Sequence, residues 1–321
     1  MQERNAYMTR IILDVDTGTD DAVAIMMAAL APEIELLACT TVWGNLDVEH
    51  TTENTLRVLD HIGAEVPVHR GRNRPIVPVP PGARAAHRTI AGYHPERLDL
   101  PEPRTPEAPG DAPMQIVEMV RAAREPLTLV ATGSLTNIAA ALIIDPELPQ
   151  HVEQLVLMGG ANEFGNVTPA AEANIWQDPS AAEIVFQAGF EKLVIVPLDA
   201  THRALITQDQ ADELAARGTP AAQAAAQLIT ERIIVHDRDQ PQPIPHSAAV
   251  HDALCIAYLL EPEVLELHRM HVAAETVPGH SFGRTVLDVR RRSTQEPNAL
   301  VALSADRERF FSLMLSSLSR G

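Results

Sequence analysis

Residues 11–21 read IILDVDTGTDD and place four carboxylates, on Asp14, Asp16, Asp20 and Asp21, in a stretch without lysine or arginine. The apolar run at 10–15 predicts a buried strand, and TGTDDA predicts the turn into a helix. Alternate side chains of a strand share a face, so Asp14 and Asp16 point the same way, and the turn returns Asp20 and Asp21 to the strand's carboxyl end. The stretch therefore predicts a βα unit with four acids in one crevice.

The rest of the chain repeats this alternation of apolar strands and amphipathic helices. Strands are expected near 10–15, 34–41, 66–69, 127–131, 154–158 and 193–197, and helices near 20–31, 47–62, 112–124, 135–144, 179–189, 207–217 and 220–235. Such alternation is typical of a mostly parallel sheet covered by helices on both faces. The last part predicts a helix at 251–260, strands near 270–277, 284–290 and 298–303, and a closing helix at 305–318, which favours a mixed sheet edge.

We therefore predict an α/β fold with a mostly parallel central sheet flanked by helices and a Rossmann-like core. A single domain is expected over 1–321, with 1–9 flexible. The proline-rich stretch at 75–109 and the segment at 237–247 are expected to be long loops, which in compact domains are usually lids or binding loops.

Composition excludes several classes of partner. The 321 residues carry 43 acidic and 25 basic side chains, a net charge of −18, which disfavours nucleic-acid and anionic membrane surfaces. The polar start of the chain resembles no targeting signal, and no apolar run is long enough to span a bilayer. Cys39 and Cys255 lie in apolar contexts and indicate core thiols in a reducing compartment. We expect a soluble cytoplasmic protein.

Four crowded carboxylates repel one another and raise one another's pKa. A bound divalent cation relieves this repulsion, and an all-oxygen ligand set suits Ca²⁺ or Mg²⁺. The alternative for a single acid is an ordinary helix start, in which Asp20 or Asp21 favours the helix N-terminus and Thr19 caps it.

Two phosphate-binding motifs are rejected, because the turn has one glycine and no lysine where a Walker loop or a dinucleotide fingerprint needs them. The DVDTGT stretch also resembles the strand-terminal motif of aspartate-nucleophile phosphatases. That class needs a lysine to balance the phosphate, and Lys192, the only lysine, is poorly placed. It also leaves Asp20 and Asp21 unexplained.

Four further segments carry polar residues at predicted strand ends or helix starts. They are TTVWGN (40–45), VATGSLTNIA (130–139), VLMGGANEFGNVTPAAEANIWQDP (156–179) and AAVHDAL (248–254). Taken in order with DVDTGTDDA, they resemble the nucleoside hydrolases, the inosine-uridine-preferring ribohydrolase family, from about residue 10 to 317. The resemblance implies an active site at the carboxyl ends of parallel strands.

The resemblance also implies roles for individual residues. Asp16, Asp21 and Asp252, with the backbone carbonyl of Thr132, would hold Ca²⁺, and Asp14 would support them. The ribose hydroxyls would be bound by Asp20, Asn45, Asn166, Glu172 and Asn174. These oxygen and amide groups complement sugar hydroxyls, which both donate and accept hydrogen bonds. Taken singly, the asparagines are also compatible with ordinary turns beside glycine.

Cleavage of an N-glycosidic bond builds positive charge on the ribose, which carboxylates stabilise. Asp16 is the predicted general base for the attacking water, and His251 is the candidate acid for the departing base. His94 is matched to a base-covering loop of the family, although its surroundings, GYHPERLDL (92–100), depart from the family pattern. The segment 230–247 has no tyrosine where relatives often carry one.

With Trp43 and Trp176 read as packing residues, tryptophan stacking of a purine is not evident, and we expect a pyrimidine-accepting or broad ribonucleoside hydrolase. The resemblance implies a homodimer or homotetramer. An idle nucleoside- or ribose-binding module is the alternative from another class. It would be favoured by loss of Asp16 or Asp252, both of which are present.

Overall fold

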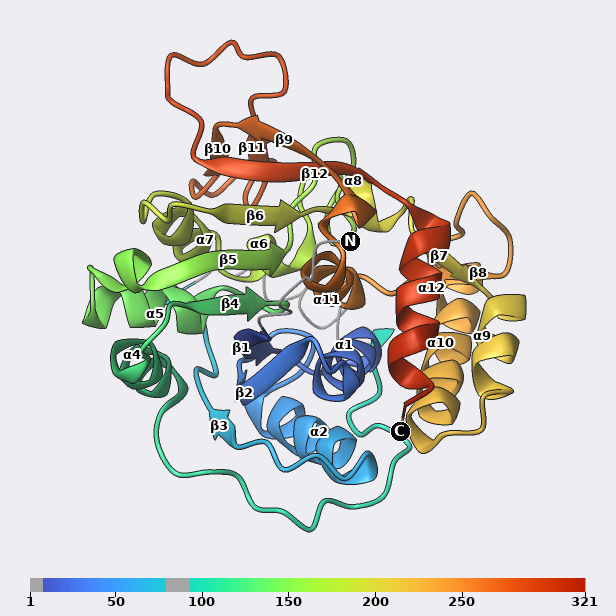
Figure 1. Ribbon diagram of the computed structural model, residues 1–321. Helices are drawn as coiled ribbons and strands as arrows, with labels where there is room; N and C mark the ends of the chain where they lie inside the picture. The colour runs from blue at the N-terminus through green and yellow to red at the C-terminus, as the bar shows by residue number, and fades with distance from the viewer. Residues whose placement is uncertain (1–7, 79–92, 321) are drawn as a thin grey trace, which may run out of the picture.

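A computed structural model describes residues 8–78 and 93–320. Its central sheet has eight strands in the order β3-β2-β1-β4-β5-β6-β12-β9 (Figure 1). The strands of this sheet are β1 (Thr9–Val15), β2 (Ile34–Thr41), β3 (Val68–Arg70), β4 (Leu127–Ala131), β5 (Val152–Met158), β6 (Leu193–Val196), β9 (Leu265–Met270) and β12 (Ala299–Ala305). Only β9 runs antiparallel, beside β12, so the predicted mixed edge is confirmed. Two small antiparallel pairs lie outside it, β7 (Leu205–Thr207) with β8 (Ser247–Ala249) and β10 (Val272–Ala274) with β11 (Thr285–Leu287).

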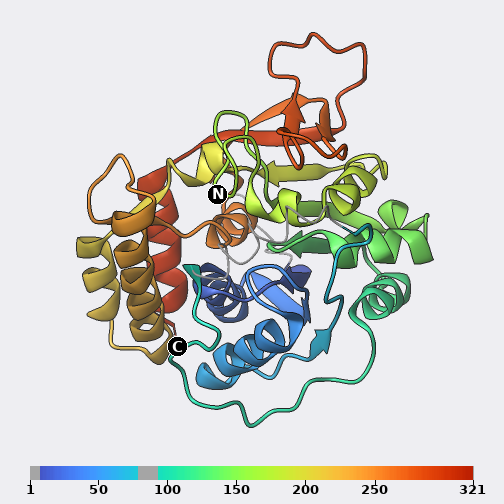
Figure 2. The same cartoon turned by 180° about the vertical axis from the view of Figure 1, so that it is seen from behind.

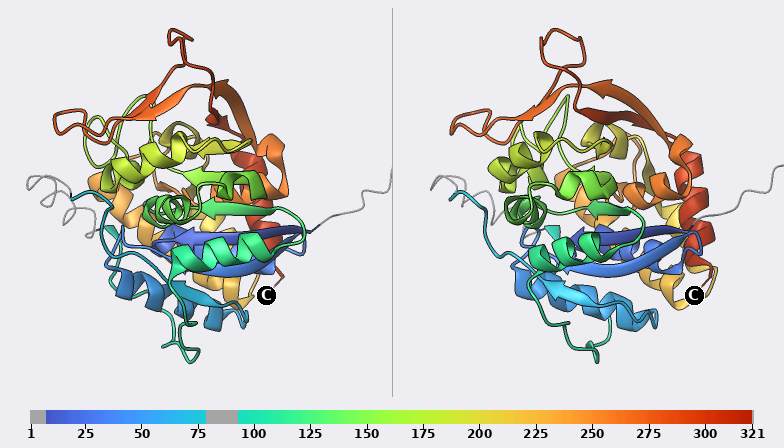
Figure 3. Two further views of the ribbon diagram at one scale, coloured as in Figure 1. Left: turned by 90° about the vertical axis from the view of Figure 1, so that its left-hand side faces the viewer. Right: turned by 60° about the vertical axis from the view of Figure 1, so that its left-hand side comes forward.

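Helices cover both faces of the sheet, as the side views in Figure 3 show. One layer holds α1 (Thr19–Leu30), α2 (Val48–His61), α10 (Pro220–Asp239), α11 (Ala253–Leu260) and α12 (Arg307–Leu318). The other holds α4 (Ala112–Ala122), α5 (Thr136–Ile144) and α7 (Pro179–Phe186). Shorter helices are α6 (Ala173–Gln177), α8 (Leu198–Thr201) and α9 (Gln208–Ala215), with α9 packed along α10 (Figure 2).

Two large apolar clusters, one on each face of the sheet, make up most of the core. In β1, Ile11 and Leu13 belong to one cluster and Ile12 to the other, as the two-residue period of a strand requires. Because both faces of β1 are covered, its sequence is a continuous apolar run rather than an alternating one.

The structure corrects several predicted boundaries. The strand expected near 270–277 is divided into β9, which begins at Leu265, and β10, while α6, α8, β7 and β8 were not predicted. Strand β1 begins at Thr9, inside the segment expected to be flexible, and residues 1–7 lie outside the described part of the chain. The middle of the predicted loop at 75–109 also lies outside it, at 79–92. None of the described helices has both the length and the apolar character of a membrane span.

Candidate active site

The strand order reverses between β1 and β4, because β2 and β3 lie on one side of β1 whereas β4, β5 and β6 follow on the other. Doubly wound sheets bind ligands at the carboxyl ends of the strands at such a reversal. Asp16 directly follows β1 there, and Thr132 directly follows β4. The fold thus creates a crevice between the two loops that carry the predicted site.

A pocket of about 650 Å³ opens at this edge. Nine of the twelve predicted site residues line it: Asp20, Asn45, His94, Thr132, Asn166, Glu172, Asn174, His251 and Asp252. The other three, Asp14, Asp16 and Asp21, are at most 1% exposed. The structure therefore brings together residues that lie up to 238 positions apart in the chain, from Asp14 to Asp252.

Asp16 is held by the loop after β2. Its Oδ2 accepts the backbone N–H of Asn45 at 2.7 Å, and its Oδ1 lies 3.2 Å from the Asn45 amide nitrogen. Two glycines make room for it, since a Cβ on Gly44 would lie 1.9 Å from Asp16 Oδ2 and one on Gly133 would lie 2.9 Å from its Cβ. The glycines are required by this close approach.

Asp21 accepts hydrogen bonds from three residues, one of them a long contact of 3.5 Å from the Asn45 amide nitrogen to its Oδ2. Its Oδ2 accepts the backbone N–H of Gly18 at 3.0 Å, and its Oδ1 accepts the Thr132 hydroxyl at 2.8 Å. Gly18, not Thr19, occupies the N-cap of α1. The alternative that Asp21 supports the helix start is thus correct in part, while its other oxygen faces the β4 loop.

Three carboxylates come close enough to share a cation. Oxygens of Asp20, Asp21 and Asp252 lie within 4.8 Å of one another, and all three residues are buried. Asp252 is the N-cap of α11 but makes no side-chain capping hydrogen bond, so its carboxylate is not committed to the helix. A set of buried hard oxygen donors fits a divalent cation such as Ca²⁺ or Mg²⁺.

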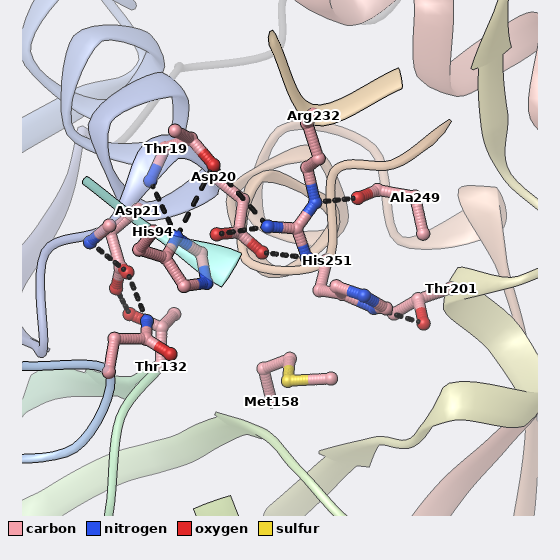
Figure 4. A network of polar contacts seen from close by, with 12 residues as sticks. Thr19, Asp20, Asp21, His94, Thr132, Met158, Thr201, Arg232, Ala249 and His251 are labelled. Carbon is pink, nitrogen blue, oxygen red and sulfur yellow. Dashed lines mark hydrogen bonds and ion pairs between the residues drawn. The ribbon is translucent and has the colours of Figure 1, made fainter. Parts of the chain in front are cut away.

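Asp20 has a basic partner, Arg232, although the stretch that carries the four acids, 11–21, contains no lysine or arginine. Its Oδ2 lies 3.1 Å from Nη2 of Arg232, and its Oδ1 accepts a hydrogen bond from Nη1 at 3.2 Å (Figure 4). Burial is the largest single influence and by itself raises the pKa of Asp20. The Arg232 guanidinium, together with smaller contributions, outweighs burial, so the pKa of Asp20 lies below its usual value. Sequence reasoning missed Arg232, which α10 brings in from 212 residues downstream.

Asp14 lies in β1 behind this cluster. Its Oδ1 accepts the Thr40 hydroxyl at 2.5 Å and the Asn137 amide at 2.7 Å, and its Oδ2 has no partner among the described residues. Burial raises its pKa to about 7. Asp14 thus lies next to the acids that it is predicted to support.

Glu172 and Asn174 stand at the start of α6. The Glu172 carboxylate accepts three backbone N–H groups, those of Gly160 at 2.8 Å, Asn174 at 2.9 Å and Ile175 at 3.2 Å. The Asn174 amide nitrogen donates to the carbonyls of Thr132 at 2.7 Å and Met158 at 3.1 Å, so only its oxygen is left for a sugar hydroxyl. Glu172 therefore shapes the loop after β5 in addition to lining the pocket.

Asn166 belongs to the same loop. Its Oδ1 accepts the backbone N–H of Ala173 at 3.0 Å, and its own carbonyl accepts the Gln240 amide at 3.3 Å. The Asn166 amide nitrogen is the group left for a ligand.

Both predicted histidines, His94 and His251, line the pocket. The Nδ1 of His94 accepts the backbone N–H of Thr19 at 3.2 Å, which fixes the neutral ring with its proton on Nε2. A Cβ on Gly18 would lie 2.2 Å from this Nδ1, so glycine is needed there. The Nδ1 of His251 lies 2.7 Å from the Thr201 hydroxyl.

Burial is the largest cause of the pKa shifts in the site. It raises the pKa of Asp21 and Glu172 to about 7 and that of Asp16 and Asp252 well above the usual value, with the neighbouring acids adding to the shift of the three aspartates. It lowers the pKa of His94 to about 4. In the absence of a cation, the carboxylates therefore retain protons at a pH where isolated ones are ionised.

Comparison with known proteins agrees with this geometry. The sequence profile described as Inosine-uridine preferring nucleoside hydrolase matches residues 11–312. This chain belongs to that family. The match contains all twelve predicted site residues, and it sets aside the phosphatase alternative.

Similar proteins are described with different base preferences. A pyrimidine-specific ribonucleoside hydrolase RihA of Photobacterium profundum is 39% identical over 316 residues, covering 96% of this chain and 98% of the relative. A purine-preferring ribonucleoside hydrolase from Gardnerella vaginalis has a TM-score of 0.84 at 30% identity, covering 97% and 98%. A plant nucleoside hydrolase, PpNRh1, has a TM-score of 0.85 at 27% identity, covering 98% and 100%. The family fold is confirmed over nearly the whole chain.

Proposed function

We propose that this chain hydrolyses the N-glycosidic bond of ribonucleosides in a Ca²⁺-dependent reaction and that it accepts pyrimidines. The observation that carries the proposal is the buried set of carboxylates at the switch point of the sheet, next to a pocket lined by amide and acid groups. The similarity to RihA enzymes, described as pyrimidine-specific, supports the choice of base. Among the described residues that line the pocket there is no tryptophan to stack on a purine.

The proposed cation site consists of Asp16, Asp21, Asp252 and the Thr132 carbonyl. Asp21 and Asp252 belong to the close set of three carboxylates, whereas its third member, Asp20, is paired with Arg232 and is assigned to the ribose. When bound, a divalent cation supplies the positive charge that keeps such carboxylates ionised and makes water more acidic. Asp16 is the proposed base that takes a proton from the attacking water. The hydrogen bond from the Asn45 backbone N–H fixes the Asp16 carboxylate. A general base must be held within hydrogen-bond distance of the proton that it removes.

The ribose is proposed to lie against Asp20, Asn45, Asn166, Glu172 and Asn174. As the bond breaks, positive charge develops on the sugar, and the surrounding carboxylates stabilise it. An ordinary 5′-nucleotide would bring a phosphate toward these acids, so free nucleosides are the proposed substrates.

His94 and His251 are proposed to contact the base, with His251 as the proton donor. Burial keeps the pKa of His251 well below its usual value, so the ring is neutral near pH 7 and must gain a proton before it can act as a strong acid. The Thr201 hydroxyl occupies Nδ1, which leaves Nε2 for the pocket. We also propose a homodimer or homotetramer and a cytoplasmic location, which sedimentation and cell fractionation would test.

A panel of steady-state rates tests the function. We expect uridine and cytidine to be cleaved to ribose and base with kcat/KM at least equal to that of inosine, and the matching 5′-nucleotides to be poor substrates. The panel includes wild type after exhaustive chelation, with and without added Ca²⁺. Binding of uridine without any turnover at saturating Ca²⁺ would support the idle binding module instead.

A further inference from the structure

Helix α10 presents one guanidinium to the acidic pocket. Arg232 is 9% exposed, and its Nε donates to the carbonyl of Ala249, at the end of β8, at 2.7 Å. Its Nη1 lies 3.2 Å from Asp20 Oδ1 and 3.3 Å from the Thr19 hydroxyl, and its Nη2 lies 3.1 Å from Asp20 Oδ2. Contacts to α1 and β8 thus hold the side chain from two directions.

These contacts leave part of the guanidinium free for a ligand. A guanidinium carries five N–H groups, and the Ala249, Thr19 and Asp20 partners account for at most four of them. Among the described residues, the remaining N–H belongs to Nη2, and Arg232 lines the pocket. The bidentate pair with Asp20 fixes its plane, so no side-chain freedom would be lost when a ligand binds.

The pocket has two electrostatic ends. Figure 4 shows Asp20 between the Asp21–Thr132 pair on one side and Arg232 with His251 on the other. Among the described pocket-lining residues, Arg232 is the only lysine or arginine. Its charge adds to burial in lowering the pKa of His94 to about 4 and that of His236 to about 3, so these rings stay neutral. The permanent positive charge at this end is therefore the guanidinium.

Helix α10 also supplies the wall around this charge. Val235 and His236 follow Arg232 by three and four residues and line the same pocket, as the helical period requires. Gln240, just past the end of the helix, lines it too. This wall lies beside Asp20, the acid proposed to bind the ribose, and so is placed to meet the group attached to the sugar.

We propose that Arg232 is a catalytic residue that contacts the departing pyrimidine and stabilises the negative charge on its 2-carbonyl oxygen. The proposal rests on the proposed ribonucleoside hydrolysis. When the bond between C1′ and N1 breaks, the electron pair remains on the base and spreads from N1 to the carbonyl oxygens. Water adds its hydroxyl to C1′ and gives a proton to Asp16, and the base anion then takes a proton from His251, the proposed donor, which regains it from solvent. The 2-carbonyl is next to the broken bond, on the ribose side of the base.

The test compares leaving groups of different stability in the Ca²⁺-loaded enzyme. We expect Arg232→Gln to lower kcat/KM for uridine by roughly 10²–10³, the usual effect of removing one donor to a developing oxyanion. The loss should be smaller for 5-fluorouridine and smallest for 4-nitrophenyl riboside, because those anions are already stabilised. Arg232→Lys should recover part of the uridine rate because it keeps the charge.

The ratio of rates between substrates separates this role from a structural one. A smaller fraction of folded enzyme lowers all three rates equally and leaves their ratio unchanged. Arg238→Gln is the matched control, on the same helix but exposed and paired with its neighbour Asp239, and should leave all three rates unchanged. Equal losses on all three substrates, or an unchanged uridine rate in Arg232→Gln, would overturn the proposal. Hydrolysis of uridine by wild type in the same assay tests the proposed function separately.

Discussion

Replacement of Glu172 by glutamine tests how far one carboxylate combines a sugar contact with a structural role. Its oxygens accept three backbone N–H groups, from Gly160, Asn174 and Ile175. The glutamine oxygen can keep the position of Oε2, which accepts from Gly160 and Ile175. Its NH₂ group then faces the N–H of Asn174, and one buried donor loses its acceptor.

The cost follows from that lost hydrogen bond. A hydrogen bond to a charged group contributes about 1.5–3 kcal/mol, and a buried donor left unsatisfied costs a comparable amount. We therefore expect a loss of about 3 kcal/mol in the free energy of unfolding. With an unfolding entropy of about 2.1 cal/mol/K per residue, this lowers Tm by roughly 4 °C in a chain of this length.

Calorimetry and steady-state kinetics are the two measurements. We expect Glu172→Gln to lower both Tm and kcat/KM for uridine, whereas Glu163→Gln, an exposed change in the same loop, should alter neither. A variant with wild-type Tm and a reduced rate would show that Glu172 acts on the sugar alone. Wild-type values of both would refute the assigned hydrogen bonds.

Three further predictions concern the acids and the metal. Asp16→Ala should lower kcat by more than the roughly 10²–10⁴ of a general base alone, because it also removes a proposed ligand; an effect as small as that of Glu172→Gln would contradict this. The Tm of metal-free protein should fall as the pH is raised from about 4 to about 7, because burial raises the pKa of Asp14 and Asp21 to about 7 and the folded state therefore favours their protonated forms. Ca²⁺ should restore most of the lost Tm at pH 8. A Tm that does not change with pH would argue against these pKa shifts. Gly44→Ala should abolish activity and weaken Ca²⁺ binding, measured by calorimetry, because the new Cβ would displace Asp16. Gly63→Ala is the control: a Cβ there meets no other atom, but φ is +67°, so only stability should change.

The sequence by itself determined the parallel sheet and the βα units. The strands predicted at 34–41 and 127–131 agree residue for residue with β2 and β4. Apolar runs bounded by turns are typical of strands in a covered sheet, and β4 is buried along its whole length. The ends near β9 and β10 were less well predicted. Short strands at a sheet edge are half exposed, so their apolar signal is weak and their pairing depends on distant partners.

The acids of the first turn and the asparagines after the strands were also visible in the sequence, since charge inside an apolar context requires an explanation. Whether they meet was decided by the order of the strands, which places the β1 and β4 loops side by side. Only the tertiary structure paired Asp20 with Arg232. The sole sequence signal for that arginine is its position on the apolar face of α10, four residues after Leu228 and three after Ile229. Helical periodicity shows that such a residue is buried, but its partner 212 positions away follows from packing of α10 against α1, which no local pattern encodes.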